Sequence, residues 1–156
     1  NKKGEKIMPI KSFRGRIGNN QVDTISLHTN TGSKGYRIVK FQTLPKVPEN
    51  QNEEACLQIF SIEPPAVTAA SNGEVDFNNQ TLLAASFFSS ATGATASPED
   101  YTVIFDNTIF NQDIYVASKS QGDVNYYIEL EQITLDLNEN TVATLKDIKN
   151  IEQSQQ

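Results

Sequence analysis

The sequence predicts an all-β protein, an antiparallel β-sandwich of jelly-roll or related type with about eight strands. Short runs rich in β-branched and aromatic residues recur along the 156 residues, and turn-forming residues separate them. Apolar residues make up 37% of the chain and are concentrated in those runs, as a thin two-layer core requires. There is no internal repeat or shift in composition. We therefore expect one domain over residues 8–150, an N-terminal extension over 1–7 and a flexible tail over 151–156.

Three strands are expected in the first part of the chain. Residues 21–28 (QVDTISLH) have alternating apolar positions, and the glycine-rich cluster at 29–35 provides a turn. Residues 36–44 (YRIVKFQTL) form a denser strand, and the prolines in 45–54 predict an exposed loop after it. Residues 55–63 (ACLQIFSIE) are the third strand, which Pro-Pro ends.

The middle of the chain contains the strongest hairpin signal. Asn72-Gly73 tolerates positive φ at both positions, so it is expected to connect a strand at 66–70 with one at 74–77. Residues 81–89 (TLLAASFFS) are apolar at both odd and even positions, which predicts a strand buried on both faces or at an interface. Residues 89–100 are polar and of low complexity, and read as a loop.

The last third contains two short strands, at 101–106 and 113–118, and then a longer one at 124–137. In the longer strand the apolar positions are even-numbered up to Leu130 and odd-numbered from Ile133 onward. Because one extra residue would allow this change of parity, we expect a β-bulge near residues 130–133. For the C-terminal part a strand at 141–145 is favoured, with a short helix over 141–148 as the alternative.

The charge is unevenly distributed. The net charge of −6 and the pI near 4.8 argue against nucleic-acid binding, which requires a basic face. The first sixteen residues nevertheless carry six basic residues and one acidic residue, against seven and eighteen in the rest of the chain. Such a basic arm predicts docking through Lys11, Arg14 and Arg16 onto an acidic neighbour, such as another copy of the chain. The alternative is a solvated tail.

The residues before Met8 raise the question of where the natural protein starts. Met8-Pro9-Ile10 looks like a natural start, because β-patterned sequence follows it directly. Residues 1–7 are then interpretable as translated leader. No segment resembles a signal peptide, and no apolar run approaches the ~18 residues of a transmembrane helix.

Catalytic groups are too few to form the usual sets. His28 and Cys56 are the only residues of their types, so neither a multi-histidine zinc site nor a disulfide framework is possible, and a Cys–His pair is a remote alternative. Glu129 and Glu131 lie ~7 Å apart along one strand, which overlaps the carboxylate spacing of an inverting glycosidase. Alternation places both outward, however, where a solvated face is the ordinary interpretation. We expect no enzyme, no cofactor and no metal.

The remaining features favour binding. The surface is rich in Asn, Gln, Thr and Ser, which suits hydrated contacts with subunits or sugars. The apolar run over 82–88 is a candidate subunit contact, with ordinary core as the alternative; its large side chains are Leu82, Leu83, Phe87 and Phe88.

A resemblance to known proteins rests on residues 8–15 (MPIKSFRG), 35–42 (GYRIVKFQ), 105–107 (FDN), 110–115 (FNQDIY), 125–131 (NYYIELE) and 144–148 (TLKDI). These segments resemble a family of uncharacterised structural proteins encoded by marine tailed bacteriophages. The resemblance implies a virion component made in the host cytoplasm, and it supplies no catalytic residues. A homo-oligomeric capsid decoration protein or head–tail accessory is expected, in contact with itself and other virion proteins but not directly with nucleic acid or a membrane.

A second function from another class is a carbohydrate- or receptor-binding module on the same sandwich. Such a site needs exposed aromatic rings beside polar side chains. The sequence offers Tyr101, Tyr115 or Tyr127 for this role, and no Trp. Surface glycans would then be the partner.

Overall fold

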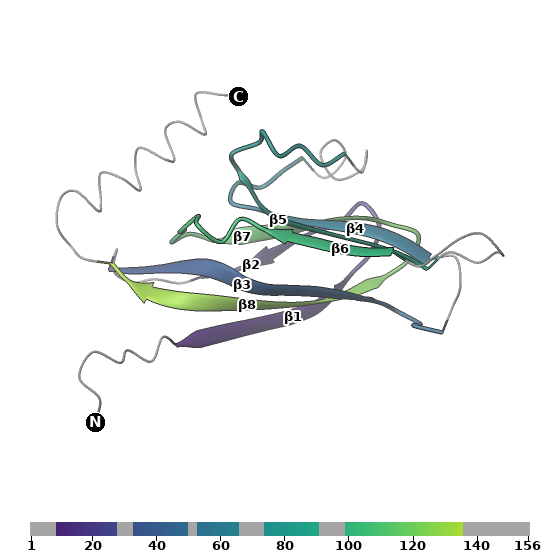
Figure 1. The fold of residues 1–156 in the computed structure, drawn as a ribbon, viewed down its shortest axis with the longest axis horizontal. Helices are drawn as coiled ribbons and strands as arrows, with labels where there is room; N and C mark the ends of the chain where they lie inside the picture. Colours follow the sequence, from purple (N-terminus) through teal and green to yellow (C-terminus); the bar gives the residue numbers. More distant parts are fainter. Residues whose placement is uncertain (1–8, 28–32, 50–52, 66–73, 91–98, 136–156) are drawn as a thin grey trace.

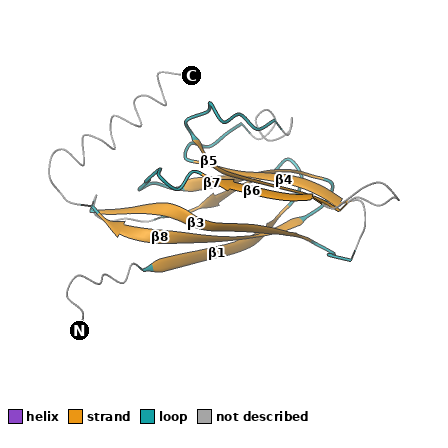
Figure 2. Ribbon diagram, viewed as in Figure 1, coloured by secondary structure: helices purple, strands orange, loops and turns teal. Residues whose placement is uncertain are grey.

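The computed structural model describes residues 9–27, 33–49, 53–65, 74–90 and 99–135, which form two antiparallel sheets packed face to face (Figures 1 and 2). No helix occurs within these ranges. The predicted all-β sandwich is therefore confirmed. The eight strands are β1 (Ile10–Ile17), β2 (Val22–Ile25), β3 (Lys34–Pro45), β4 (Glu53–Phe60), β5 (Leu82–Ser90), β6 (Glu99–Ile104), β7 (Ile114–Ser120) and β8 (Val124–Thr134).

The strand order is close to that of a jelly roll. One sheet has the order β1-β8-β3 and the other the order β2-β7-β4-β5-β6. The pairs β4–β5, β2–β7 and β1–β8 are nested, as if one long hairpin had been folded over on itself. Complete nesting would also pair β3 with β6. Here β6 pairs with β5 instead, so β3 and β6 are edge strands of different sheets.

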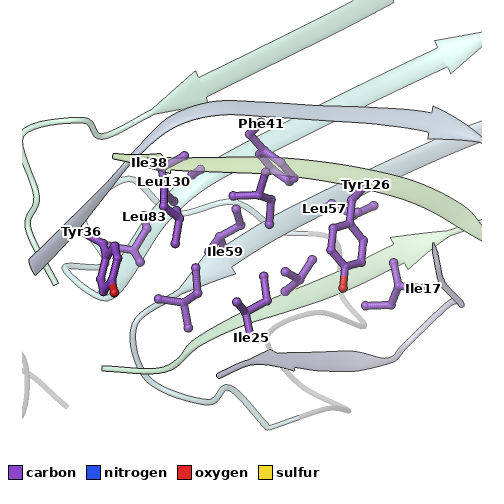
Figure 3. Close-up of a cluster of buried hydrophobic side chains, with 14 of the residues drawn as sticks. Ile17, Ile25, Tyr36, Ile38, Phe41, Leu57, Ile59, Leu83, Tyr126 and Leu130 are labelled. Carbon is purple, nitrogen blue, oxygen red and sulfur yellow. The ribbon is translucent and has the colours of Figure 1, made fainter. Parts of the chain in front are cut away.

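The core lies between the sheets and is formed by every second residue of the central strands (Figure 3). Burial of each large aliphatic side chain contributes about 1.5–3 kcal/mol, so this layer supplies most of the favourable free energy of folding. Among the described side chains, every fully buried polar atom has a hydrogen-bond partner. The large side chains with almost no exposed surface include Ile17, Ile38, Leu57, Ile59, Ile114, Ile128 and Leu130.

Strand β5 is buried on both faces, as its sequence predicts. Leu83 packs in the core between the sheets, whereas Leu82 belongs to a second apolar cluster that also contains Phe60 and Ala117. Part of the connection between β4 and β5 extends over this outer cluster, because the Phe77 ring meets the Phe105 ring edge to face at 5.3 Å. This end of the five-stranded sheet is therefore covered on its outer face.

Most strand positions agree with the sequence prediction, although the ends differ by a few residues. The second strand of the expected hairpin is absent, because residues 74–77 do not form a strand. The expected first strand and turn, residues 66–73, lie outside the described residues. Asp76 starts a turn here, since its carboxylate and its carbonyl accept from the backbone N–H groups of Asn78 and Asn79. The C-terminal strand or helix over 141–148 also lies outside the described residues, as do His28 and the segments 1–7 and 151–156.

The predicted bulge in β8 was wrong, and the extra residue lies in β3. Ile38 pairs with Leu130 and Lys40 with Glu129, which leaves Val39 unpaired. The buried positions of β3 change parity here, from Ile38 to Phe41. A bulge is easier to accommodate in β3 because β3 is an edge strand, whereas β8 is hydrogen-bonded on both sides.

A tyrosine connects the two sheets through the core. Tyr126 of β8 donates its hydroxyl to Asp23 Oδ2 of β2 at 3.0 Å. Burial, and then the hydrogen bond and the charge of Asp23, raise the pKa of Tyr126 above its ordinary value, so the phenol stays neutral and continues to donate. Gly15 of β1 lies opposite Tyr126, and a Cβ there would approach the tyrosine hydroxyl to 2.6 Å. Gly15 therefore leaves the space that the ring occupies.

We predict that Gly15→Ala lowers the free energy of unfolding by about 1–3 kcal/mol, because the new methyl group displaces a buried ring and weakens its bond to Asp23. Urea denaturation measures the change. The matched control is Gly122→Ala, since a Cβ at Gly122 meets nothing within 4 Å, and its effect should stay within about 0.5 kcal/mol. Equal effects of the two substitutions would contradict this account.

Candidate functional site

No described element lies over the outer face of the three-stranded sheet (Figure 1). The register of β1, β8 and β3 arranges its side chains in rows across the sheet. Arg16, Asn125 and Leu44 form one row, and Arg14, Tyr127 and Gln42 the next. Two further rows are centred on Glu129 and Glu131. We call this surface the charged face; its ionisable side chains other than tyrosine are Arg14, Arg16, Arg37, Lys40, Glu129 and Glu131.

The basic side chains of β3 are matched by carboxylates of β8. Arg37 Nε and Nη2 both lie 2.7 Å from Glu131 Oε2. Lys40 Nζ lies 5.9 Å from the centroid of the Tyr127 ring, beside Glu129, its pairing partner. Each such surface contact contributes at most about 1 kcal/mol. Their main effect is to hold long side chains in fixed positions.

Tyr127 is oriented by a neighbouring acid. Its hydroxyl donates to Glu129 Oε2 at 2.6 Å. This hydrogen bond is the main cause of the raised pKa of Tyr127, with burial and the glutamate charge adding to it. A phenol is already protonated at neutral pH, and the raised pKa keeps it donating to Glu129 into the alkaline range.

The basic side chains of β1 have a different environment. Arg16 Nε donates to the neutral Asn125 Oδ1 at 3.3 Å. Lys11 lies on the opposite side of the strand, where its ammonium contacts the Tyr36 hydroxyl at 3.2 Å. Lys11, Arg14 and Arg16 form no salt bridge within the described part of the chain. The positive charge of β1 is thus not neutralised locally.

The charged face also exposes apolar side chains. Ile10 is 51% exposed, Val39 38% and Leu44 54%, and each is among the most exposed large apolar residues described. Val39 is the bulge residue of β3, and the other two occupy the outer rows of the sheet. A mixture of ion pairs and exposed aliphatic groups is typical of a hydrated contact surface.

A hollow of about 1020 Å³ adjoins this face, where β3 and β6 lie at the edges of their sheets. A hydroxyl chain crosses between the sheets nearby, since Thr43 and Thr102 each lie 3.1 Å from Ser86 Oγ. The polar side chains lining the hollow include Arg14, Lys40, Gln42, Asp100, Asn125 and Tyr127.

The residues predicted from the sequence to mediate contacts do not form one site. Lys11, Arg14 and Arg16 lie in β1, so they belong to a paired strand and not to a free arm or tail. The run containing Leu82 and Phe88 lies in the other sheet. Leu82, Leu83 and Phe88 are buried within the chain, as the core alternative expects, whereas Phe87 is only partly buried.

Cys56 and the two glutamates are also located. Cys56 lies on the outer face of the five-stranded sheet between Phe87 and Lys119, its pairing partners. Burial raises the pKa of the Cys56 thiol, which opposes a role as a nucleophile. Glu129 and Glu131 point outward on β8 and contact Tyr127 and Arg37, as described above.

Sequence reasoning missed the contribution of β3 to the charged face. Arg37 and Lys40 are on the same outer face only because Val39 is an extra residue between them. Their odd and even numbers suggested opposite faces. The sequence of β8 did contain a hint, because its alternation places Tyr127, Glu129 and Glu131 on the outer face. The strands paired with β8 had to provide the side chains next to them on that face.

Comparison with known proteins found no matching family model and no matching curated protein. Among the described residues, no cluster of three or more His, Cys, Asp or Glu side chains is suited to hold a metal ion. The same ranges contain no helix that is long and apolar enough to cross a membrane.

We predict that Cys56 reacts slowly with iodoacetamide in the folded protein at pH 8, because burial both shields the thiol and lowers its thiolate fraction. The reaction should accelerate at least tenfold when the same chain is unfolded in urea. Mass spectrometry of the alkylated protein measures both rates. Equal rates in the folded and unfolded chain would contradict this description of the thiol.

Proposed function

We propose that the chain is an oligomeric structural subunit of a tailed-phage particle, acting through contacts with other subunits as a capsid decoration protein or head–tail accessory. The observation that carries the proposal is the charged face, which no described element covers. Its exposed Ile10, Val39 and Leu44 share the face with the Arg37–Glu131 ion pair. The segment resemblance to phage structural proteins supplies the biological setting.

The electrostatics support contact with an acidic neighbour. The charged face has four basic and two acidic side chains, on a protein whose net charge is −6. Glu131 already contacts Arg37, and Glu129 already contacts Tyr127. Arg14 and Arg16 are therefore the cations available to a partner.

Such a subunit would stabilise a particle through many weak contacts that act together. A single hydrated contact on a flat sheet is weak, because ion pairs exposed to solvent contribute little. A symmetric lattice repeats the contact many times, and the second and later contacts of a linked assembly form at high effective concentration. Decoration by a small β-sandwich requires no catalytic group.

The hollow between β3 and β6 favours a second candidate, a carbohydrate-binding module. Tyr127 contributes an aromatic ring to its lining, and Gln42, Asn125 and Asp100 contribute hydrogen-bonding groups. Tyr101 is 61% exposed but lies on the outer face of the other sheet, and Tyr115 is half-buried. Of the three tyrosines expected from the sequence, Tyr127 is the one that lines the hollow.

The primary test is the composition of phage particles produced with this gene. Mass spectrometry of gradient-purified particles should find the chain at a stoichiometry comparable with that of the known structural proteins. A chain that is abundant in the lysate but absent from the particles would refute the structural role.

We predict that Arg14→Glu with Arg16→Glu lowers occupancy on particles at least tenfold, because the reversed charges repel an acidic neighbour. Quantitative mass spectrometry of purified particles measures occupancy. The matched control is Lys34→Glu with Lys46→Glu, which changes the net charge equally at exposed positions at the two ends of β3. The control should bind normally, and equal losses would show that net charge alone matters.

For the second candidate, a glycan array is the test. If the chain binds glycans, Tyr127→Ala should abolish the signal, because it removes the aromatic surface from the hollow. Tyr101→Ala is the matched control, since it removes an exposed tyrosine elsewhere. An array without hits for the unchanged protein would eliminate this candidate.

A further inference from the structure

Each sheet of the sandwich has two edge strands, and two of the four edges are structurally protected. β2 has four residues, which leaves little backbone to pair with. β3 is blocked at Tyr36, whose backbone exchanges hydrogen bonds of 2.7 and 2.9 Å with Phe110. The bulge at Val39 and the missing N–H of Pro45 disrupt its remaining edge. Short strands, bulges and prolines are common means of preventing edge-to-edge pairing.

The other two edges lack these features. β1 pairs with β8 in continuous register over eight residues, and β6 pairs with β5 over six. Neither strand contains a proline or a bulge. Within the described part of the chain, β1 pairs only with β8 and β6 only with β5. Both strands are largely exposed, β6 along almost its entire length.

These two open edges carry opposite charges. β1 has Lys11, Arg14 and Arg16 and no acidic residue, whereas β6 has Glu99 and Asp100 and no basic residue. No salt bridge among the described residues neutralises either group. Charges of one sign on every open edge would keep all edges of identical copies apart. Opposite signs still prevent pairing of like edges but attract β1 of one copy to β6 of another.

We propose that β1 of one copy pairs antiparallel with β6 of a second copy, joining the three-stranded sheet of one to the five-stranded sheet of the other. This inference rests on the proposed function of self-assembly and specifies the contact. The partner is a second copy of this chain, and the charge complementarity of the two open edges selects it.

The side-chain pattern fits one register. With Arg16 opposite Asp100, Arg14 falls opposite Thr102. Antiparallel pairing of β1 with β6 makes the outer face of one copy's three-stranded sheet continuous with the inner face of the other copy's five-stranded sheet, because the two sheets of each copy face each other. Arg16 and Asp100 then form a cross-strand ion pair on one face of the joined sheet. On its other face, Phe13 lies opposite the exposed Val103 and Gly15 lies opposite Tyr101.

The contact uses different patches on the two copies. Every copy therefore keeps a free β1 or a free β6 after pairing, and the assembly grows into a closed ring or an open filament. One junction of six residues is small and weak, so closure or attachment to a particle is needed for a stable assembly.

Charge reversal with mixing tests the proposal on the full chain. One variant has Arg14→Glu and Arg16→Glu, and the other has Glu99→Lys and Asp100→Lys. Each variant alone has like charges on both edges, so light scattering should give the monomer mass of 17.3 kDa where the unchanged chain associates. An equimolar mixture restores opposite charges at every junction, and its mean mass should return to at least twice that of the monomer. Raised salt should dissociate the unchanged assembly.

Three results would overturn the proposal. The first is an unchanged chain that stays monomeric up to about 1 mM, the dissociation constant of a very weak contact. The second is a variant that still associates alone, and the third is a mixture of the two variants that stays monomeric. Circular dichroism checks the fold of each variant. Should a double reversal unfold the chain, the milder Arg16→Gln and Asp100→Asn must each weaken association.

The outcomes also separate this inference from the proposed function. A chain found in particles but monomeric at about 1 mM refutes the edge pairing and retains the structural role. A chain that self-associates through these edges but is absent from particles does the opposite.

Discussion

The alternation of residues along β8 is the constraint on which the three-stranded sheet depends. Its even-numbered residues from Val124 to Leu130 are buried in the core, and its odd-numbered residues form the middle of the charged face. β8 is hydrogen-bonded to β1 on one side and β3 on the other, so its register positions both neighbours. A slip by one residue would exchange the two faces and place Glu129 in the core, which makes this register strongly preferred.

The departure from complete jelly-roll nesting determines which edges are open. If β6 paired with β3 in place of β5, β3 would be an inner strand, and β6 and β5 would be the edges on this side of the sandwich. Pairing of β6 with β5 leaves β6 at the end of a five-stranded sheet and β3 at the end of the other. The bulge at Val39 and the Tyr36–Phe110 bridge then protect β3, but nothing comparable protects β6 among the described residues. The change of partner thus makes β3 an edge strand beside the hollow and places the acidic edge of β6 in the five-stranded sheet.

The sequence was sufficient for the fold class and for most strands, because alternation and turn residues are local signals. It did not show which of two paired strands contains an extra residue, since both β3 and β8 have a parity change in their apolar pattern. It also did not distinguish an edge strand from a basic arm. β1 has charged residues on both faces, and only Phe13 and Ile17 are large apolar side chains turned towards the core. Two apolar residues at this spacing occur by chance in a tail as well. The charged face required knowledge of long-range pairing, because Arg14, Tyr127 and Gln42 become neighbours only through register.

The same register explains why the unneutralised positive charge lies on β1. The two carboxylates of β8 occupy the rows that contain Lys40 and Arg37 on β3, and there β1 contributes the uncharged Ser12 and Ile10. Arg14 and Arg16 lie in the other two rows, opposite Tyr127 and Asn125, which carry no charge. Shifting β1 by two residues would place Arg14 opposite Glu129 and preserve the faces, but it would move Gly15 away from Tyr126. The space that Tyr126 needs to reach Asp23 thus fixes the position of β1 and, with it, a basic edge on an acidic protein.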